Sequence, residues 1–269
     1  MPVYKADANV LRHQPVGEAD RILTLFTREY GKLRVSARGV RKTTSRLGGR
    51  VQPYTHGRFL LARGRTLDVV AQAESVRAFP GLQQDLLRSA YAAYVAELVD
   101  RFLPERDRHP DVFDTVLDAL AVIEEATEDE AEVYALWFSL HLADSLGYRP
   151  EMAQCVACGR ALPAGDPAGR SAATWAFSPA AGGALCPSCA ADVAGAVRVA
   201  PGILATGGYL LRVSADRARR LRVPDRQRRD LARLVQQHLE YHLDGRLRAP
   251  AVIARLRQAV APRAAAPRA

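Results

Sequence analysis

The chain has 269 residues, of which 48 % are hydrophobic and 25 % charged, a length that suits two or three compact units with buried cores. No run of about 18 apolar residues occurs, so a transmembrane helix is excluded, and residues 1–7 lack the apolar core of a signal peptide. We therefore expect a cytoplasmic protein without a membrane partner.

The net charge of +9 is distributed unevenly along the chain. Residues 1–80 carry +9, residues 81–152 carry −11 and residues 153–269 carry +11. A basic head, an acidic middle and a basic tail are typical of separate modules. Two of these modules suit a polyanionic partner.

Residues 1–79 have the pattern of a small β-barrel. Between residues 32 and 38, apolar Leu33, Val35 and Ala37 alternate with basic or polar residues, as in a strand with one buried and one open, basic face. Strands are expected near residues 3–12, 21–27, 32–38, 57–62 and 67–76. Five short strands without a helical period predict an N-terminal OB-fold β-barrel in an α+β chain of several domains.

Helical periodicity begins at Pro80 and predicts a helical domain over residues 80–149. Thr127 and Glu130 have the spacing of a capping box, and Gly147 stands where a helix C-terminus ends. We expect the acidic excess to lie on the solvated faces of these helices. The period returns after residue 200, so residues 201–258 are expected to complete the helical domain, and the Ala/Pro/Arg-rich residues 259–269 to form a disordered tail.

All four cysteines fall in the intervening segment, residues 150–200, as two Cys-x-x-Cys pairs: Cys155, Cys158, Cys186 and Cys189. Each pair can donate two thiolates from one tight turn, so the four predict a closed, structural Zn²⁺ site in an inserted Cys₄ module. Unliganded thiols and redox chemistry remain as alternatives. Four thiolates leave no open position for an activated water, and His238-Leu239-Glu240 lies downstream of the cysteines, so a zinc deaminase is excluded.

The stretch between Glu29 and Asp68 contains no acidic residue and ten basic residues. Basic side chains interleaved with Gly, Ser and Thr suit contact with phosphates, without motifs that read bases. Tyr30, Tyr54 and Phe59 are candidates for base stacking, with core packing as the alternative. The predicted nucleic-acid-binding residues are Lys32, Arg34, Arg38, Arg41, Lys42, Arg46, Arg50 and Arg58.

No set of residues assembles into an active site, so we do not expect an enzyme. Phosphate-binding loops, nucleophile elbows and His-Glu-x-x-His motifs are absent from the sequence. His238 and His242, one helical turn apart, are expected to be surface or core histidines rather than metal ligands. An acidic cluster is expected to serve capping and solubility, with a nuclease metal site as the alternative; its members are Glu124, Glu125, Glu128, Asp129 and Glu130.

The segment Gly17–Lys42 resembles the opening of bacterial RecO proteins, a family of recombination mediators in DNA repair. The segment Leu47–Tyr54, the pair Ala73–Glu74 and the four cysteines are similar to that family as well. The resemblance implies a non-enzymatic protein that binds single- and double-stranded DNA and anneals complementary strands. It also implies that the protein acts with RecR and with the acidic tail of single-strand-binding protein to load recombinase.

Two further hypotheses follow from the basic tail and from the cysteines. The C-terminal arginines could hold a second DNA strand, with a solvated helix face as the alternative; they are Arg217, Arg219, Arg220, Arg222, Arg226, Arg228 and Arg229. A zinc-ribbon transcription factor or RNA-binding factor is the alternative function.

Overall fold

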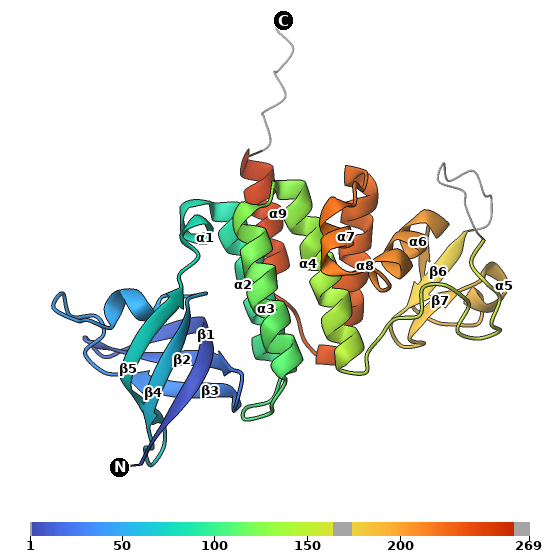
Figure 1. Ribbon diagram of the computed structural model, residues 1–269. Helices are drawn as coiled ribbons and strands as arrows, with labels where there is room; N and C mark the ends of the chain where they lie inside the picture. Colours follow the sequence, from blue (N-terminus) through green and yellow to red (C-terminus); the bar gives the residue numbers. More distant parts are fainter. Residues whose placement is uncertain (1, 164–173, 261–269) are drawn as a thin grey trace, which may run out of the picture.

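The computed structural model describes residues 2–163 and 174–260 and begins with a closed five-stranded barrel (Figure 1). The strand order around it is β1-β2-β3-β5-β4, with β4 pairing back onto β1, so the prediction of an OB-type barrel is confirmed. The strands are β1 (Val3–Val16), β2 (Asp20–Thr27), β3 (Gly31–Ala37), β4 (His56–Ala62) and β5 (Asp68–Arg77).

The barrel has its own core, built by inward-facing residues such as Leu25, Val35 and Phe59. Strands β3 and β5 run parallel and pair at only two positions, Val35 with Asp68 and Ser36 with Val69. The loop between β3 and β4 closes the barrel end because its residues Val40 and Val51 are buried in the same core. A single turn of 3-10 helix, η1 (Gly48–Val51), lies in this loop.

A bundle of helices stands beside the barrel. Thr127 accepts a hydrogen bond from the N–H of Glu130, and the Glu130 side chain accepts one from the N–H of Thr127, so the predicted capping box is confirmed. Gly147, at φ +81°, ends the same helix as expected. The helices are α1 (Pro80–Gln84), α2 (Leu86–Phe102), α3 (Pro110–Glu125), α4 (Glu128–Ser145), α6 (Pro201–Leu210), α7 (Ala215–Arg220), α8 (Asp225–Leu243) and α9 (Ala249–Val260).

Helix α9 extends through residues 259 and 260, which were expected to begin the disordered tail. Residues 261–269 of that tail, and residues 164–173 of the cysteine insert, lie outside the described residues. Within the described ranges, no helix combines the length and the apolar character needed to cross a membrane.

The cysteine module follows α4 and lies at the end of the molecule farthest from the barrel (Figure 1). Its three-stranded sheet has the order β7-β6-β8, with fully buried Trp175 and Phe177 on the central strand. The strands are β6 (Trp175–Ser178), β7 (Gly183–Leu185) and β8 (Val197–Val199), and the short helix α5 spans Pro187–Ala190.

Helices α2 and α3 cover the outer face of β1 and β2. Leu11 and Phe26 of the barrel belong to the hydrophobic core of the helices, and the rings of Phe26 and Phe113 lie 5.8 Å apart. Gly31, at φ +66°, packs so closely against the α2–α3 loop that a Cβ would lie 1.9 Å from the carbonyl oxygen of Asp107. The barrel and the helices therefore share one continuous interface.

Candidate nucleic-acid interface and metal site

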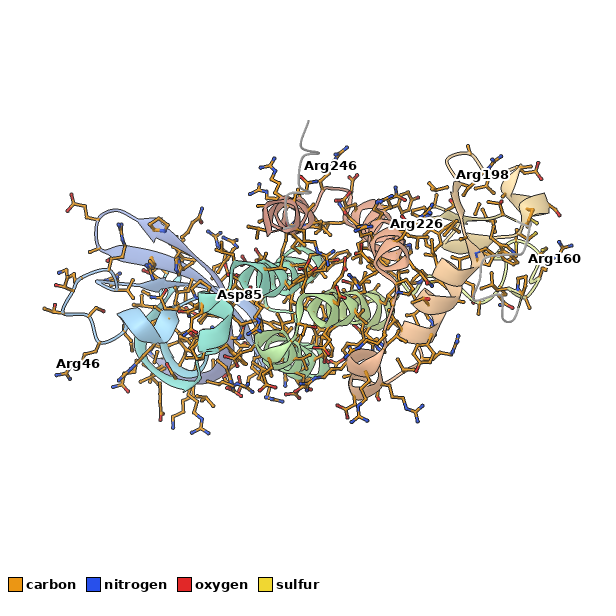
Figure 2. All side chains as sticks on the ribbon, turned by 90° about the horizontal axis from the view of Figure 1, so that it is seen from above. Arg46, Asp85, Arg160, Arg198, Arg226 and Arg246 are labelled. Carbon is orange, nitrogen blue, oxygen red and sulfur yellow. The ribbon has the colours of Figure 1, made fainter. Side chains whose placement is uncertain are left out.

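The loop between β3 and β4, residues 38–55, is named here the basic loop. Five of its side chains are exposed and cationic: Arg38, Arg41, Lys42, Arg46 and Arg50. The loop is anchored to the β1–β2 turn, since Gly39 N–H donates to the Asp20 carboxylate (2.7 Å) and Arg41 N–H donates to the Ala19 carbonyl (2.9 Å). The basic loop lies at the end of the barrel away from the helices, with Arg46 at its tip (Figure 2).

The cations of the acid-free stretch are almost all unpaired. Nine of the ten make no ion pair within 4.0 Å in the part of the chain that the structure describes. Two guanidinium groups are instead oriented by carbonyl groups: Arg41 donates to Gly17 (3.1 Å) and Arg50 to Ala73 (3.0 Å). The nine are Arg34, Arg38, Arg41, Lys42, Arg46, Arg50, Arg58, Arg63 and Arg65.

The tenth cation, Lys32, is placed differently, and the expectation that it lies on an open basic face is wrong. Lys32 is only 8 % exposed because the end of α2 covers it. Its amine donates to the backbone carbonyl of Asp100 and lies 3.2 Å from the Asp100 carboxylate. Arg12 reaches the same carboxylate at 2.7 Å. Lys32 therefore joins the barrel to the helices and is not available to a nucleic acid.

Two further ion pairs at this interface also have the cation on the barrel. Arg28 pairs with Asp114, and its guanidinium lies 4.9 Å from the centre of the Phe113 ring. Arg77 pairs with Glu124 at 3.1 Å. Burial opposes ionisation of Asp100, but the hydrogen bond from Arg12 and the charge of Lys32 outweigh it and hold the pKa of Asp100 below its usual value.

Arg34 and Arg58 lie on strands rather than on the basic loop. Arg34 is exposed on β3, opposite Thr24 of β2. Arg58 is exposed on β4, but its cross-strand neighbours are acidic, Asp7 on one side and Glu74 on the other. The local charge around Arg58 is therefore partly cancelled, and the basic loop is the strongest cationic surface of the barrel.

The candidate stacking residues serve mainly as packing. Phe59 is fully buried in the barrel core. Tyr30 is half-buried and packs edge-on against Tyr4 at 4.9 Å, and Tyr54 packs against the core of the helices. The core-packing alternative is therefore correct for Phe59.

The four cysteines come together as their spacing predicts. Their Sγ atoms all lie within 4.8 Å of one another, and those of Cys158 and Cys186 are 3.8 Å apart. A tetrahedral zinc with Zn–S bonds of about 2.3 Å needs S···S separations of about 3.8 Å, so the cluster could hold such an ion. The first pair is tied to β7 by the hydrogen bond from Val156 N–H to the Ala184 carbonyl (2.9 Å).

The pKa values within the cluster diverge. Burial opposes ionisation of Cys155, but backbone N–H groups of Cys186 and Cys158 outweigh it and lower the pKa of Cys155 to about 6. The neighbouring thiols of Cys186 and Cys158 raise the pKa of Cys189 to about 12. The backbone N–H of Cys189 also lowers the pKa of Cys186, so Cys155 and Cys186 favour the thiolate, and a cation among the four would favour ionisation of the remaining ones.

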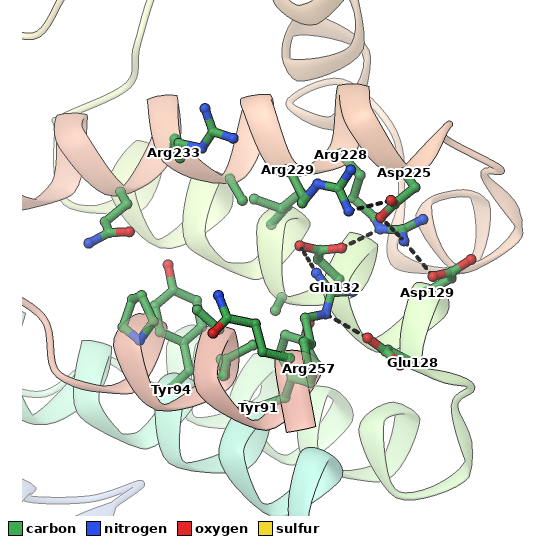
Figure 3. A pocket seen from close by; sticks show the side chains of 18 residues that line it. Tyr91, Tyr94, Glu128, Asp129, Glu132, Asp225, Arg228, Arg229, Arg233 and Arg257 are labelled. Carbon is green, nitrogen blue, oxygen red and sulfur yellow. Dashed lines mark hydrogen bonds and ion pairs between the residues drawn. The ribbon is translucent and has the colours of Figure 1, made fainter. Parts of the chain in front are cut away.

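A groove with a volume of about 830 Å³ lies between α2, α4, α8 and α9 (Figure 3). Tyr91 lines it, and the buried hydroxyl of this residue has no hydrogen-bond partner among the described residues. Arg229 and Arg233 are exposed at the rim. One wall is a buried ion-pair network in which Glu132 bridges Arg228 and Arg257. Glu132 is thus an exception to the expectation that the acidic residues lie on solvated faces.

The acidic cluster of residues 124–130 is engaged with arginines from other elements. Glu128 pairs with Arg257 (2.6 Å) and Glu130 with Arg222 (2.9 Å). Of the seven C-terminal arginines proposed to hold a second strand, three pair with this cluster, and a fourth, Arg229, pairs with Asp225 of its own helix. The three are Arg219, Arg222 and Arg228. Sequence patterns could not separate these paired arginines from unpaired ones.

His238 is a core histidine, as expected, because it is 2 % exposed and its Nε2 lies 2.7 Å from the Tyr148 carbonyl oxygen. His242 is half-buried and stacks on the Tyr148 ring at 4.7 Å. The one cluster of metal-ligating side chains found among the described residues is that of the four cysteines.

An OB-type barrel with an unpaired basic loop, a helical bundle and a four-cysteine module together define a multidomain protein of the OB-fold class. The chain belongs to the RecO family of DNA repair proteins. The model of the N-terminal part of recombination protein O matches residues 1–79, and that of the C-terminal part matches residues 83–251.

Curated relatives share this assignment over nearly the whole chain. The DNA repair protein RecO of Pelotomaculum thermopropionicum is 42 % identical over 97 % of both chains. The DNA repair protein RecO of Heliobacterium modesticaldum is 37 % identical over 94 % of this chain and 90 % of its own. The predicted role in DNA repair and recombination is therefore confirmed.

Proposed function

We propose that the protein is a non-enzymatic recombination mediator that binds single- and double-stranded DNA through the basic loop. The observation that carries this proposal is that the five exposed cations of the basic loop have no ion-pair partner among the described residues. Unpaired cations exchange their counterions for phosphates, and the released ions drive binding. Contacts to phosphates carry no sequence information, so binding is independent of base sequence and weakens with salt.

Annealing of complementary strands requires charge neutralisation rather than bond chemistry. Two phosphate backbones repel each other, and a cationic loop lowers that repulsion while the bases stay free to pair. On this basis the protein anneals strands and helps to load recombinase onto DNA coated by single-strand-binding protein. Since it acts on DNA, the protein is proposed to work in the cytoplasm, at the nucleoid.

The metal of the four-cysteine cluster is proposed to be a structural Zn²⁺ held by Cys155, Cys158, Cys186 and Cys189. The separation of two sulfur atoms and the closed set of four thiols support this choice. Zinc supplies a crosslink between the two Cys-x-x-Cys turns when it is bound. Phe177 of β6 packs edge-on against His238 of α8, with ring centres 5.7 Å apart, and so joins the module to the helical bundle.

Two protein partners are proposed, RecR and the acidic tail of single-strand-binding protein. The groove between α8 and α9 suits such a tail because exposed Arg229 and Arg233 border a floor that includes Tyr91 and Leu136 (Figure 3). Burial raises the pKa of Tyr91, so its hydroxyl remains a hydrogen-bond donor for a carboxylate. A labelled tail peptide should bind at least tenfold more weakly to Arg233→Glu than to the wild type.

The function is tested by reversing the charges of the basic loop. The variant Arg41→Glu/Lys42→Glu/Arg46→Glu should lose both DNA binding and annealing of strands coated by single-strand-binding protein. Exposed Arg160 and Arg198 lie at the opposite end of the molecule (Figure 2), and exposed Arg212 follows α6. Together they provide a control with the same charge change, Arg160→Glu/Arg198→Glu/Arg212→Glu. Unchanged annealing by the loop variant would overturn the assignment of the basic loop.

Two simpler measurements separate the alternatives. Cleavage of labelled single-stranded DNA in the presence of magnesium would contradict a non-enzymatic function and favour a nuclease. DNA binding that depends on the cysteine module rather than on the basic loop would favour a zinc-ribbon transcription or RNA-binding factor.

A further inference from the structure

Five arginines from four segments of the chain meet where the barrel joins the helices. They are named here the junction arginines: Arg12, Arg34, Arg101, Arg246 and Arg248. We propose that they form a second phosphate-binding track, on which a single-stranded nucleic acid continues from the barrel onto the helical bundle. The proposal rests on the proposed function and adds a surface that is separate from the basic loop.

The barrel end of the track follows from strand register. Arg12 of β1 pairs with Thr24 of β2, and Thr24 pairs with Arg34 of β3. The three residues therefore form one row across neighbouring strands. Because adjacent strands lie about 4.8 Å apart, the Cα atoms of the two arginines are separated by about 10 Å.

The row continues onto the helices through α2. Arg12 binds the carboxylate of Asp100, and Arg101 is the next residue on α2. The guanidinium group of Arg101 lies over Gly245, where a Cβ would come within 2.8 Å of its Nη2. Arg246 and Arg248 follow directly in the α8–α9 turn, and Figure 2 shows Arg246 at the edge of the bundle.

The carboxylates of this region are occupied by other groups. Glu97 accepts hydrogen bonds from the backbone N–H groups of Arg248 and Ala249, both at 2.8 Å. Glu240 accepts a hydrogen bond from the N–H of Leu247 (3.0 Å). Asp100 pairs with Lys32 and Arg12 of the barrel. Asp244 is the exposed carboxylate of the turn. Arg12 is paired with Asp100, and the other four junction arginines outnumber the Asp244 carboxylate, so the track stays cationic.

The junction arginines differ from the paired arginines of α7 and α8. Arg34, Arg101, Arg246 and Arg248 are exposed and form no ion pair with any residue in the described ranges. Their side chains are therefore available to phosphate oxygens, which a guanidinium fork can bind in a bidentate manner. An isolated anion would need only one of them, whereas a row of arginines fits a polymer of phosphates.

An exposed aromatic residue beside the α8–α9 turn favours a single strand. Tyr241, at the end of α8, is 55 % exposed. An exposed ring next to cationic side chains is the usual combination in proteins that bind single strands, because unpaired bases stack on it. A duplex would offer the ring no free base face.

The test compares two triple variants with the same charge change. Arg101→Glu/Arg246→Glu/Arg248→Glu removes the helical end of the track and spares Arg12, which also holds Asp100. Arg217→Glu/Arg220→Glu/Arg226→Glu is the matched control, because these arginines are exposed and have no ion-pair partner among the described residues. Fluorescence anisotropy would be measured with oligothymidines of about 8 and about 30 nucleotides over a range of salt concentrations.

The junction variant should bind the longer oligonucleotide at least tenfold more weakly. The slope of its plot of log affinity against log salt should be about 2 smaller in magnitude than that of the wild type, because three contacts are lost and each single-strand contact contributes about 0.7. Its affinity for the shorter oligonucleotide, which fits the site of one OB fold, should stay within about twofold of the wild type. The control should bind both like the wild type. Tyr241→Ala should weaken binding of the longer oligonucleotide, and Tyr241→Phe should not.

Equal affinity of the junction variant and the wild type for the longer oligonucleotide would overturn the track. A loss of affinity in the control variant alone would also overturn the track, because it would mean that the second phosphate-binding surface lies on α7 and α8. Failure of the basic loop is distinguishable, because it would appear as unchanged binding of the shorter oligonucleotide by Arg41→Glu/Lys42→Glu/Arg46→Glu. The milder Arg101→Gln/Arg246→Gln/Arg248→Gln keeps the test valid if the charge reversals disturb folding. It should also lose about 2 of the slope, because it removes the same three phosphate contacts.

Discussion

Replacing Lys32 by methionine should destabilise the protein without weakening its binding to single-stranded DNA. The substitution keeps the apolar stem of the side chain and removes the buried amine that lies 3.2 Å from the Asp100 carboxylate. Removal of one partner of a buried ion pair costs about 3–5 kcal/mol. Asp100 retains Arg12 at 2.7 Å and its side chain is 19 % exposed, so we expect a smaller loss of about 2 kcal/mol.

Arg34→Met is the matched comparison, because Arg34 lies two residues further along the same strand and is exposed. Its effect on unfolding should stay within about 0.5 kcal/mol. Thermal unfolding of Lys32→Met should begin roughly 4–8 °C lower than that of the wild type. In the salt titration of DNA affinity, Arg34→Met should lose about 0.7 of the slope, while Lys32→Met keeps the wild-type slope.

The opposite pattern would refute the assignment of Lys32 to the interface. If Lys32→Met lost slope as Arg34→Met does and unfolded at the wild-type temperature, its amine would contact phosphates rather than Asp100. Lowering the pH provides a second readout. The depressed pKa of Asp100 contributes stability that is present above its unfolded value of about 3.9 and is lost as the pH falls through the folded pKa. Asp100→Asn should remove this part of the acid sensitivity.

Three further outcomes are expected. Cys158→Ser should lower the zinc content measured by elemental analysis below one equivalent and reduce thermal stability. Its binding of short oligonucleotides should stay unchanged. A full equivalent of zinc would contradict the four-cysteine site. Burial lowers the pKa of His238, so the neutral ring is favoured in the folded state and stability should fall as the pH drops below about 6.5. His238→Gln should flatten that dependence in thermal unfolding. Arg228→Met should cost about 3 kcal/mol in urea unfolding, because Glu132 is left buried with Arg257 as its remaining partner; no loss would mean that the network contributes nothing.

The barrel could be predicted from the sequence because its signals are local. Alternation in β3, the turn at Gly31 and the absence of a helical period depend on neighbouring residues, and each observed strand lies within a few residues of its expected position. The capping box of Thr127 and the two Cys-x-x-Cys turns are local in the same sense. Side chains a few residues apart determined all of these features.

The electrostatic partners could not be predicted, because they come from distant parts of the chain. Lys32 and Asp100 are separated by 68 residues, and Arg228 and Glu132 by 96. In sequence, Lys32 looks like Arg34, and Arg228 looks like Arg226. Only the packing of α2 on the barrel, and of α8 on α4, decides which of them is buried and which meets solvent.

The cover that α2 and α3 provide over the barrel has a practical consequence for truncation. A fragment ending at residue 79 would expose Leu11, Phe26 and Phe79, which belong to the core of the helices, and would tend to aggregate. It would also release Arg12, Lys32 and Arg77 from their carboxylate partners, and Arg28 from Asp114. An isolated barrel would therefore bind polyanions more tightly and less selectively than the intact chain, so its affinity would overstate that of the whole protein.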